Sequence, residues 1–237
     1  MPVISSEYQK KVLDDIKSYE GLSKPVKASL PERLFIRSAA LSKLHPNPTD
    51  EFSQAEIGPN YEIVRRYEEE FRHAVGMNHP PLKDKLTVEK MSAGGYMLMN
   101  GHHRWYAATR VAGIRRVPVE VVNLSTEETI LSALKGSQRD KCVSFDLDEV
   151  LLTDGSTVPA DRKLIFPFSR FYPLTLRKNA GVLIRSLREQ GFDVWVYTGG
   201  FSSEGHIRRL FRLHGCDVDG VITVSYTHLT LPTMAVV

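Results

Sequence analysis

The sequence predicts an α/β protein with two domains, and three observations lead to this prediction. Its 237 residues, 42% hydrophobic and 25% charged, are enough for two ordinary soluble domains. From residue 141 onward, strand and helix patterns alternate as in a parallel sheet with right-handed crossovers. Before that point, a long helix pattern, a hairpin pattern, a short helix and a strand predict an α+β domain.

The charge and the apolar pattern exclude several classes of protein. The formal net charge of +3 is spread evenly over the two halves, so neither half has the concentrated basic field of a nucleic-acid binder, and DNA is not an expected partner. The N-terminus lacks the apolar core of a signal peptide, and no run approaches the roughly 18 apolar residues of a membrane span. We therefore expect no membrane partner and a cytoplasmic location.

Cys142 and Cys216 are too few for a disulfide framework and lack a zinc-ligand spacing.

The first predicted elements are an arm and a helix. Residues 6–20 predict an amphipathic helix, and residues 21–36 predict an extended segment that packs on the domain after it. The segment "NYEIVRRYEEEF" predicts a second helix, with Asn60 as its N-cap. The apolar face of this helix consists of Ile63, Val64, Tyr67 and Phe71.

A hairpin, a short helix and a strand come next along the chain. "LTVEKM" and "GYMLM" predict two strands joined by "SAGG". Gly101 opens a helix that we expect to place Trp105, Ala108 and Ala112 on one face. "RRVPVEVV" has valine at every second position and so predicts a strand with one buried face.

The second half begins after a linking helix, predicted over residues 126–138. Its elements, in chain order, are the strand "KCVSF", the helix "LRKNAGVLIRSLREQG", the strand "FDVWVYT", the helix "SSEGHIRRLFRLHG" and the strand "VDGVIT". The last segment, "VSYTHLTLPTMAVV", has no Asp, Glu, Lys or Arg and no helical period, and we expect it to be a non-native tail.

These elements predict a division of the chain into five segments. They are an N-terminal arm over 1–32, an α+β domain over 33–124, a linker helix over 125–140, a parallel α/β domain over 141–223 and the tail over 224–237.

The stretch "NGHHRW" places basic side chains at the start of a helix. A first helical turn has unpaired N–H groups and a partial positive charge, so added cations are unfavourable there unless an anion binds. Gly101 allows the backbone to approach a ligand closely, and His102, His103 and Arg104 supply donors and charge. The pattern predicts a phosphate- or carboxylate-binding site. The alternative is a structural turn whose histidines are solvated or cap a neighbouring carbonyl.

The surrounding segment resembles the ParB/sulfiredoxin superfamily. The resemblance rests on "HPNP" at 45–48, on "LTVEKM" and on "GYMLMNGHHRWYAATRVAGIRRVPVEVVN", and it covers residues 33–124. In that superfamily the glycine-led start of the helix binds nucleotide phosphates. The resemblance therefore implies that Gly101, His102, His103 and Arg104 bind a nucleotide.

Departures from the superfamily pattern narrow the implied function. Sulfiredoxins have a catalytic cysteine where this chain has His102, so thiol chemistry is not expected. Chromosome-partition proteins continue with a helix-turn-helix, whereas this chain continues with strand–helix alternation, which disfavours a partition role. A third branch phosphorylates free serine. For that chemistry Glu68, Glu69 and Glu70 are candidate bases, and the alternative is a solvated acidic helix face.

A pair of carboxylates marks a second candidate site. "VSFDLDEVLL" places Asp146 and Asp148 at the C-terminal end of an apolar strand, where parallel sheets bind ligands. Two carboxylates held together are unfavourable without a cation, and Mg²⁺ takes oxygen ligands and brings a phosphate with it. The pattern predicts a magnesium site at Asp146 and Asp148. The alternative is a solvated acidic turn.

"DLDEV" followed by "VWVYTGG" resembles motifs I and II of the haloacid dehalogenase (HAD) superfamily, over residues 141–223. The resemblance implies a Rossmann-like domain in which Asp146 is the nucleophile of phosphoryl transfer, Asp148 the general acid and base, and Thr198 a phosphate ligand. It also implies that the backbone carbonyl of Asp148, rather than its side chain, contacts the metal. The lysine and the later acidic pair of that superfamily have no counterpart in residues 224–237. We therefore expect an incomplete HAD-like domain that is inactive as a phosphatase.

The sequence thus predicts a nucleotide-binding ParB-like domain coupled to an incomplete HAD-type phosphohydrolase domain. The expected cofactor is Mg²⁺, and the expected partner is a nucleotide or a small phosphorylated molecule. The alternatives are a non-catalytic regulatory nucleotide-binding module and a ParB-type DNA-binding protein. The sequence predicts neither the substrate nor the oligomeric state.

Overall fold

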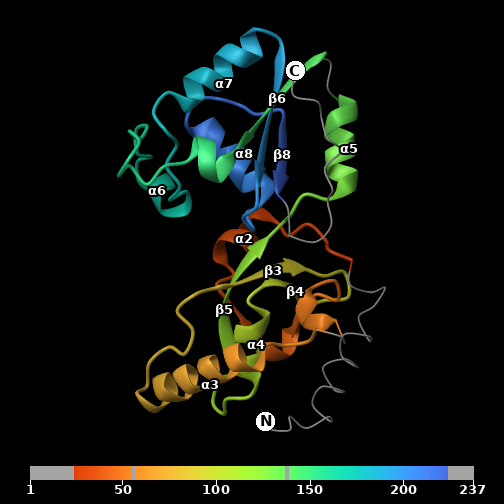
Figure 1. The fold of residues 1–237 in the computed structure, drawn as a ribbon, viewed down its shortest axis with the longest axis vertical. Coiled ribbons are helices and arrows are strands. Elements are labelled where there is room, and N and C mark those ends of the chain that lie inside the picture. Colours follow the sequence, from red (N-terminus) through yellow and green to blue (C-terminus); the bar gives the residue numbers. More distant parts are fainter. Residues whose placement is uncertain (1–23, 55–56, 137–138, 224–237) are drawn as a thin grey trace. The chain divides into compact units, whose positions relative to one another are not determined.

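The computed structural model describes residues 24–54, 57–136 and 139–223, and the chain divides into two compact units after Val122 (Figure 1). Each unit combines helices with a sheet that contains parallel strands, so the predicted α/β class is confirmed. The helix predicted over 6–20 and the tail over 224–237 lie outside the described residues, and the finer division into segments stays a prediction. Among the helices that are described, none has the length and apolar character that crossing a membrane requires.

Unit 1 is built around a five-stranded mixed sheet. Its strands are Ser38–Ala40 (β1), Leu44–His45 (β2), Leu86–Lys90 (β3), Tyr96–Asn100 (β4) and Arg116–Val122 (β5). Their order across the sheet is β1-β5-β3-β4-β2. Strands β3 and β4 form the predicted antiparallel hairpin, and β5 lies parallel to β3. The alternate valines of β5 are buried in the core, as their spacing predicts.

Among the described residues of unit 1, the α-helices are Leu30–Phe35 (α2), Tyr61–Gly76 (α3) and His102–Thr109 (α4). The predicted N-cap of α3 is confirmed, because the Asn60 side chain accepts hydrogen bonds from the N–H groups of Glu62 and Ile63. Two predictions are wrong. The segment expected to be extended contains α2, which a capping box at its first turn stabilises. Helix α4 ends at Thr109, so Ala112 lies beyond it and is exposed.

Unit 2 contains a three-stranded parallel sheet in the order β6-β7-β8. Its elements are Glu127–Gly136 (α5), Lys141–Asp146 (β6), one π-helical turn over Leu147–Leu151 (η3), Phe168–Phe171 (α6), Ala180–Glu189 (α7), Phe192–Thr198 (β7), Glu204–Leu213 (α8) and Gly220–Thr223 (β8). The predicted alternation after residue 141 is confirmed. Helix α7 begins later than expected, because Leu176 and Arg177 form β-bridges with Leu152 and Ala160.

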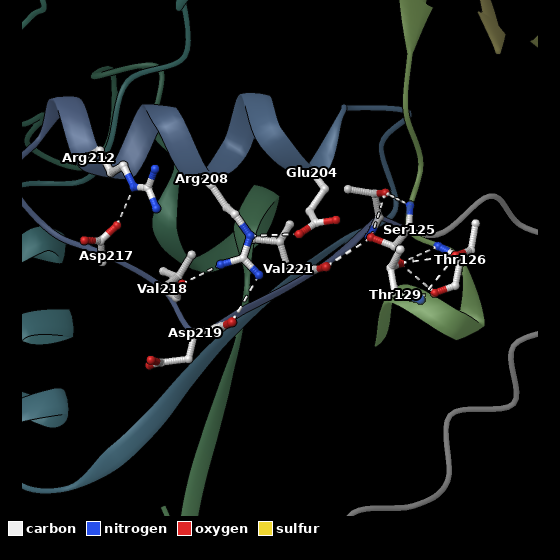
Figure 2. A network of polar contacts seen from close by, with 11 residues as sticks. Ser125, Thr126, Thr129, Glu204, Arg208, Arg212, Asp217, Val218, Asp219 and Val221 are labelled. Carbon is white, nitrogen blue, oxygen red and sulfur yellow. Dashed lines mark hydrogen bonds and ion pairs between the residues drawn. The ribbon is translucent and has the colours of Figure 1, made fainter. Parts of the chain in front are cut away.

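A polar network joins α8 and the residues at the start of α5 to β8 and the segment before it, as Figure 2 shows. The guanidinium of Arg208 on α8 donates to the carbonyl oxygens of Val218 and Asp219, at 2.7 and 3.1 Å, just before β8 begins. The Ser125 hydroxyl, which precedes α5, donates to the Val221 carbonyl at 3.0 Å. These bonds satisfy backbone acceptors at the edge of the sheet and hold α8 and α5 against β8.

Close packing at Gly220 generates a stability prediction. A Cβ on Gly220 would lie 2.1 Å from ring atoms of Trp195, the buried residue paired with it on β7. We expect Gly220→Ala to lower the free energy of unfolding by about 1–3 kcal/mol, because the indole must move within a packed core. Urea unfolding followed by far-UV circular dichroism measures the change.

The matched control is Gly136→Ala, since a Cβ there meets no atom within 4 Å and alanine favours a helix. We expect this variant to be as stable as the unsubstituted chain or slightly more stable. Equal stability of the Gly220→Ala and Gly136→Ala variants would contradict the packing argument.

Candidate functional sites

The first turn of α4 begins at a glycine with a left-handed backbone. Gly101 has φ = +94°, a conformation that side-chain-bearing residues rarely adopt. A Cβ at this position would lie 2.5 Å from Cδ2 of Leu86 and 3.1 Å from the guanidinium of Arg104. No side chain of the described residues caps the turn. Its N–H groups therefore lack the side-chain acceptor that commonly closes the start of a helix.

His102 faces the interior of unit 1. Its side chain is 5% exposed, and its Nε2 accepts a hydrogen bond from the Asn47 N–H at 3.2 Å. Burial lowers the pKa of His102 to about 4, although the Asp50 carboxylate, 3.5 Å from Nδ1, acts in the opposite direction. The imidazole is therefore neutral near pH 7 and anchors the segment after β2 to the start of α4.

His103 makes a bond of the same kind with another segment. Its Nε2 accepts a hydrogen bond from the Asn60 N–H at 3.0 Å, so it links α4 to the residue that caps α3. Burial lowers the pKa of His103 as well, and Asp50 again opposes the shift. Our expectation that both histidines add positive charge to the turn is therefore corrected, because their burial and their acceptor role keep them neutral.

Arg104 is the remaining cation of this turn. Its side chain is 17% exposed and lies 3.8 Å from the carboxylate of Asp84, a residue whose own side chain is 86% exposed. A long contact with a solvated carboxylate contributes little and is easily exchanged for another anion. The structure thus brings Gly101 and Arg104 together at the candidate anion site, with His102 and His103 positioning the turn.

The acidic run on α3 lies at the other end of α4. Glu68 is buried and forms ion pairs with Arg72, at 2.7 Å, and with Arg110, which comes directly after the last residue of α4. Glu69 and Glu70 are exposed. These positions favour a structural role for Glu68, and they place Glu69 and Glu70 on a solvated helix face. The i,i+4 spacing of Glu68 and Arg72 is the one sequence signal of that role.

The second candidate site lies at the C-terminal edge of the sheet in unit 2. Asp146 ends β6 and accepts a hydrogen bond from the Glu149 N–H at 2.7 Å. Asp148 lies in the π turn η3, and its Oδ2 accepts a hydrogen bond from the Thr198 hydroxyl at 2.5 Å. The Gly200 N–H donates to the same hydroxyl at 2.9 Å. The fold therefore joins Asp148 to Thr198, two residues that are 50 positions apart in the sequence.

The donor atoms at this edge are of the type that Mg²⁺ prefers. Asp146 and Asp148 offer carboxylate oxygens, and Mg²⁺ is commonly held by one or two carboxylates together with a substrate phosphate. Within residues 24–54, 57–136 and 139–223, no group of three or more His, Cys, Asp or Glu side chains is arranged to hold a metal ion. The magnesium site at Asp146 and Asp148 therefore stays a prediction.

Comparison with known proteins finds similarity to ParB proteins over part of the chain. A family model described as the ParB N-terminal domain matches residues 76–137, about a quarter of the chain. The C-terminally truncated chromosome-partitioning protein ParB from Caulobacter crescentus, whose crystal structure contains CTP-gamma-S, is similar at 24% identity with a TM-score of 0.29. That similarity covers 43% of this chain and 53% of the ParB chain, so this chain spans about half of that structure. No curated protein matches the chain. The ParB-like part of the prediction is supported, and no comparison supports the HAD-like part.

The buried state of His102 predicts how stability depends on pH. Below about pH 6.5 the unfolded chain binds a proton at this histidine, whereas the folded chain does not until about pH 4. The free energy of unfolding should therefore fall as the pH decreases from about 6.5 to about 4, by up to about 1.4 kcal/mol per pH unit from this group.

The variant His102→Gln removes the titrating group and keeps an acceptor for the Asn47 N–H. Urea unfolding at a series of pH values should give a shallower pH dependence for this variant than for the unsubstituted chain. Identical slopes would show that His102 is not held neutral in the folded protein.

Proposed function

We propose that unit 1 binds a nucleotide through its phosphate groups at the first turn of α4. The observation that carries this proposal is the turn itself, in which Gly101 is left-handed, no side chain of the described residues caps the helix and the Arg104 guanidinium lies beside Gly101. The match to the ParB N-terminal domain supports it, because the matched residues 76–137 include β3, β4, α4 and β5. The resemblance of "NGHHRW" to the nucleotide-binding start of that superfamily's helix points to the same ligand.

The chemistry of the turn suits a phosphate group. The N-terminus of a helix offers backbone donors and a partial positive charge, and a guanidinium can donate two parallel hydrogen bonds to phosphate oxygens. Because His102 and His103 are neutral, the turn avoids the mutual repulsion of three adjacent cations in the absence of a ligand. The long contact of Arg104 with Asp84 can be given up at little cost when a phosphate binds.

Thermal unfolding tests this proposal. A nucleoside triphosphate with Mg²⁺ should raise the melting temperature, since a ligand that binds only the folded state stabilises it by mass action. Arg104→Ala should abolish the shift and leave the melting temperature without ligand nearly unchanged. Arg65→Ala, which removes an exposed arginine on α3, is the matched control and should keep the full shift.

Two outcomes would count against nucleotide binding. A melting temperature that does not respond to millimolar triphosphate would favour the structural interpretation of the turn. Retention of the chain on duplex DNA with a steep salt dependence, and without a response to nucleotide, would favour the ParB-type DNA-binding alternative.

We further propose that the C-terminal edge of the sheet in unit 2 handles a phosphoryl group. The hydrogen bond from Thr198 to Asp148, beside Asp146 at the end of β6, is the observation that favours this second function. In a HAD-type reaction Asp146 would attack the phosphorus atom as the bond to the leaving oxygen breaks, and a protonated Asp148 would give its proton to that oxygen. The Thr198 hydroxyl has one proton, so it would turn from Asp148 in order to donate to the phosphate. When bound, Mg²⁺ would neutralise charge on the phosphate, with the Asp146 carboxylate and the backbone carbonyl of Asp148 as its protein ligands.

Phosphate-analogue binding tests this second function. Beryllium fluoride with Mg²⁺ should raise the melting temperature, because it resembles a phosphoryl group on a carboxylate. Asp146→Asn should abolish the shift, whereas Asp154→Asn, in an exposed turn of the same unit, should preserve it. Hydrolysis of an aryl phosphate by this chain should stay at background, because among the described residues no lysine pairs with Asp146 to balance its charge.

The results separate the catalytic from the regulatory interpretation. A shift that survives Asp146→Asn, or no shift at all, would show that the carboxylate pair does not bind a phosphoryl group and would favour the non-catalytic regulatory module. Robust turnover of the aryl phosphate by this chain would contradict the expected inactivity.

A further inference from the structure

Unit 2 contains a cavity of about 250 Å³ between the segment 162–175 and the end of α8. None of the carboxylates of the proposed phosphoryl site lines it, and neither does Thr198. The cavity is therefore a separate feature. The lining residues on which its chemistry depends are Arg162, Lys163, Ser169, Tyr172, Leu174 and His214.

His214 is the buried polar group of this cavity. Its side chain is 1% exposed, and within the described part of the chain neither ring nitrogen has a hydrogen-bond partner. Nδ1 lies 3.4 Å from the Asp161 carboxylate, which leaves Nε2 on the other side of the ring without a polar neighbour at bonding distance. A buried ring nitrogen without a partner costs free energy unless a ligand or water completes it.

The charge of the cavity is positive. Arg162 and Lys163 both line it, and among residues 24–54, 57–136 and 139–223 neither side chain has an acidic partner. The nearby carboxylate of Asp161 faces His214. Two cations without a counter-ion beside a buried donor are the arrangement that recognises an anionic group.

Apolar side chains form part of the remaining wall, beside Ser169 and Thr175. Leu174 and the ring of Tyr172 line the cavity, and Tyr172 stacks on His206 of α8 with the ring centroids 4.4 Å apart. Tyr172 is itself 5% exposed. Apolar side chains beside convergent polar groups are typical of a site for a small organic molecule.

We infer that this cavity binds a small organic anion, with its charged group on Arg162, Lys163 and His214 and its apolar body against Tyr172 and Leu174. A carboxylate and a phosphoryl group share the chemistry that these side chains recognise. The inference does not depend on either proposed function.

Titration with three small aromatic probes tests the inference. Phenylphosphonate and benzoate carry the two kinds of anion, and benzyl alcohol is the neutral counterpart. The full chain, kept in EDTA so that no magnesium-dependent site contributes, is followed through the imidazole resonances of His214 by nuclear magnetic resonance. We expect saturable shifts of these resonances with at least one anion below about 10 mM, and no saturation with the alcohol.

Substitutions locate the binding. Arg162→Gln and Lys163→Gln should each weaken binding of the anion by roughly tenfold, since each removes a charge-assisted hydrogen bond. Arg209→Gln on α8 and Lys178→Gln are the matched controls and should leave the affinity unchanged, because both residues are exposed and neither lines the cavity. His214→Gln should weaken binding; because this variant lacks the reporting imidazole, its binding is followed through the backbone amide signals of the other lining residues, and circular dichroism shows whether the variant is folded.

The probe that binds with the higher affinity, benzoate or phenylphosphonate, identifies the natural anion as a carboxylate or a phosphoryl compound. Binding should persist in Asp146→Asn, which separates this cavity from the phosphoryl site. No saturable shift with either anion would overturn the inference, and so would binding that the Arg162→Gln and Lys163→Gln variants retain in full.

Discussion

The neutral state of His102 is the constraint on which the candidate nucleotide site depends. Its Nε2 accepts the Asn47 N–H only while that nitrogen carries no proton, and a charged imidazole at 5% exposure would be strongly unfavourable. Strand β2 has only two residues, so the segment after it needs an anchor outside the sheet. His102 supplies that anchor, and His103 forms the matching bond to Asn60. The segment after β2 and the residue before α3 are thereby both bonded to the first turn of α4.

This arrangement changes the electrostatic account of the turn. Three consecutive basic residues at the start of a helix imply strong repulsion, but burial removes the charge from two of them. What remains is the partial charge of the helix, the backbone donors after Gly101 and one guanidinium. The histidines therefore contribute geometry to the proposed phosphate site, and Arg104 contributes charge.

Local signals made much of the fold predictable. The Asn60 cap, the hairpin and the alternating valines of β5 depend on neighbours in the sequence, and the structure confirms all three. The buried His102 bonds to a residue 55 positions away, and the buried Glu68 to an arginine 42 positions away, so no local pattern reveals either contact. The cavity beside His214 could not be predicted from the sequence either, because the segment 162–175 has no periodic pattern that indicates its secondary structure.

The backbone amides of the first turn of α4 give the most direct test of the central claim, that this turn binds nucleotide phosphates. The measurement is a titration of ¹⁵N-labelled protein with a nucleoside triphosphate and Mg²⁺, followed by two-dimensional nuclear magnetic resonance. The account predicts that the amide signals of His102, His103 and Arg104 shift most and saturate together. Saturating shifts confined to other parts of the chain, or no saturation at millimolar nucleotide, would contradict it.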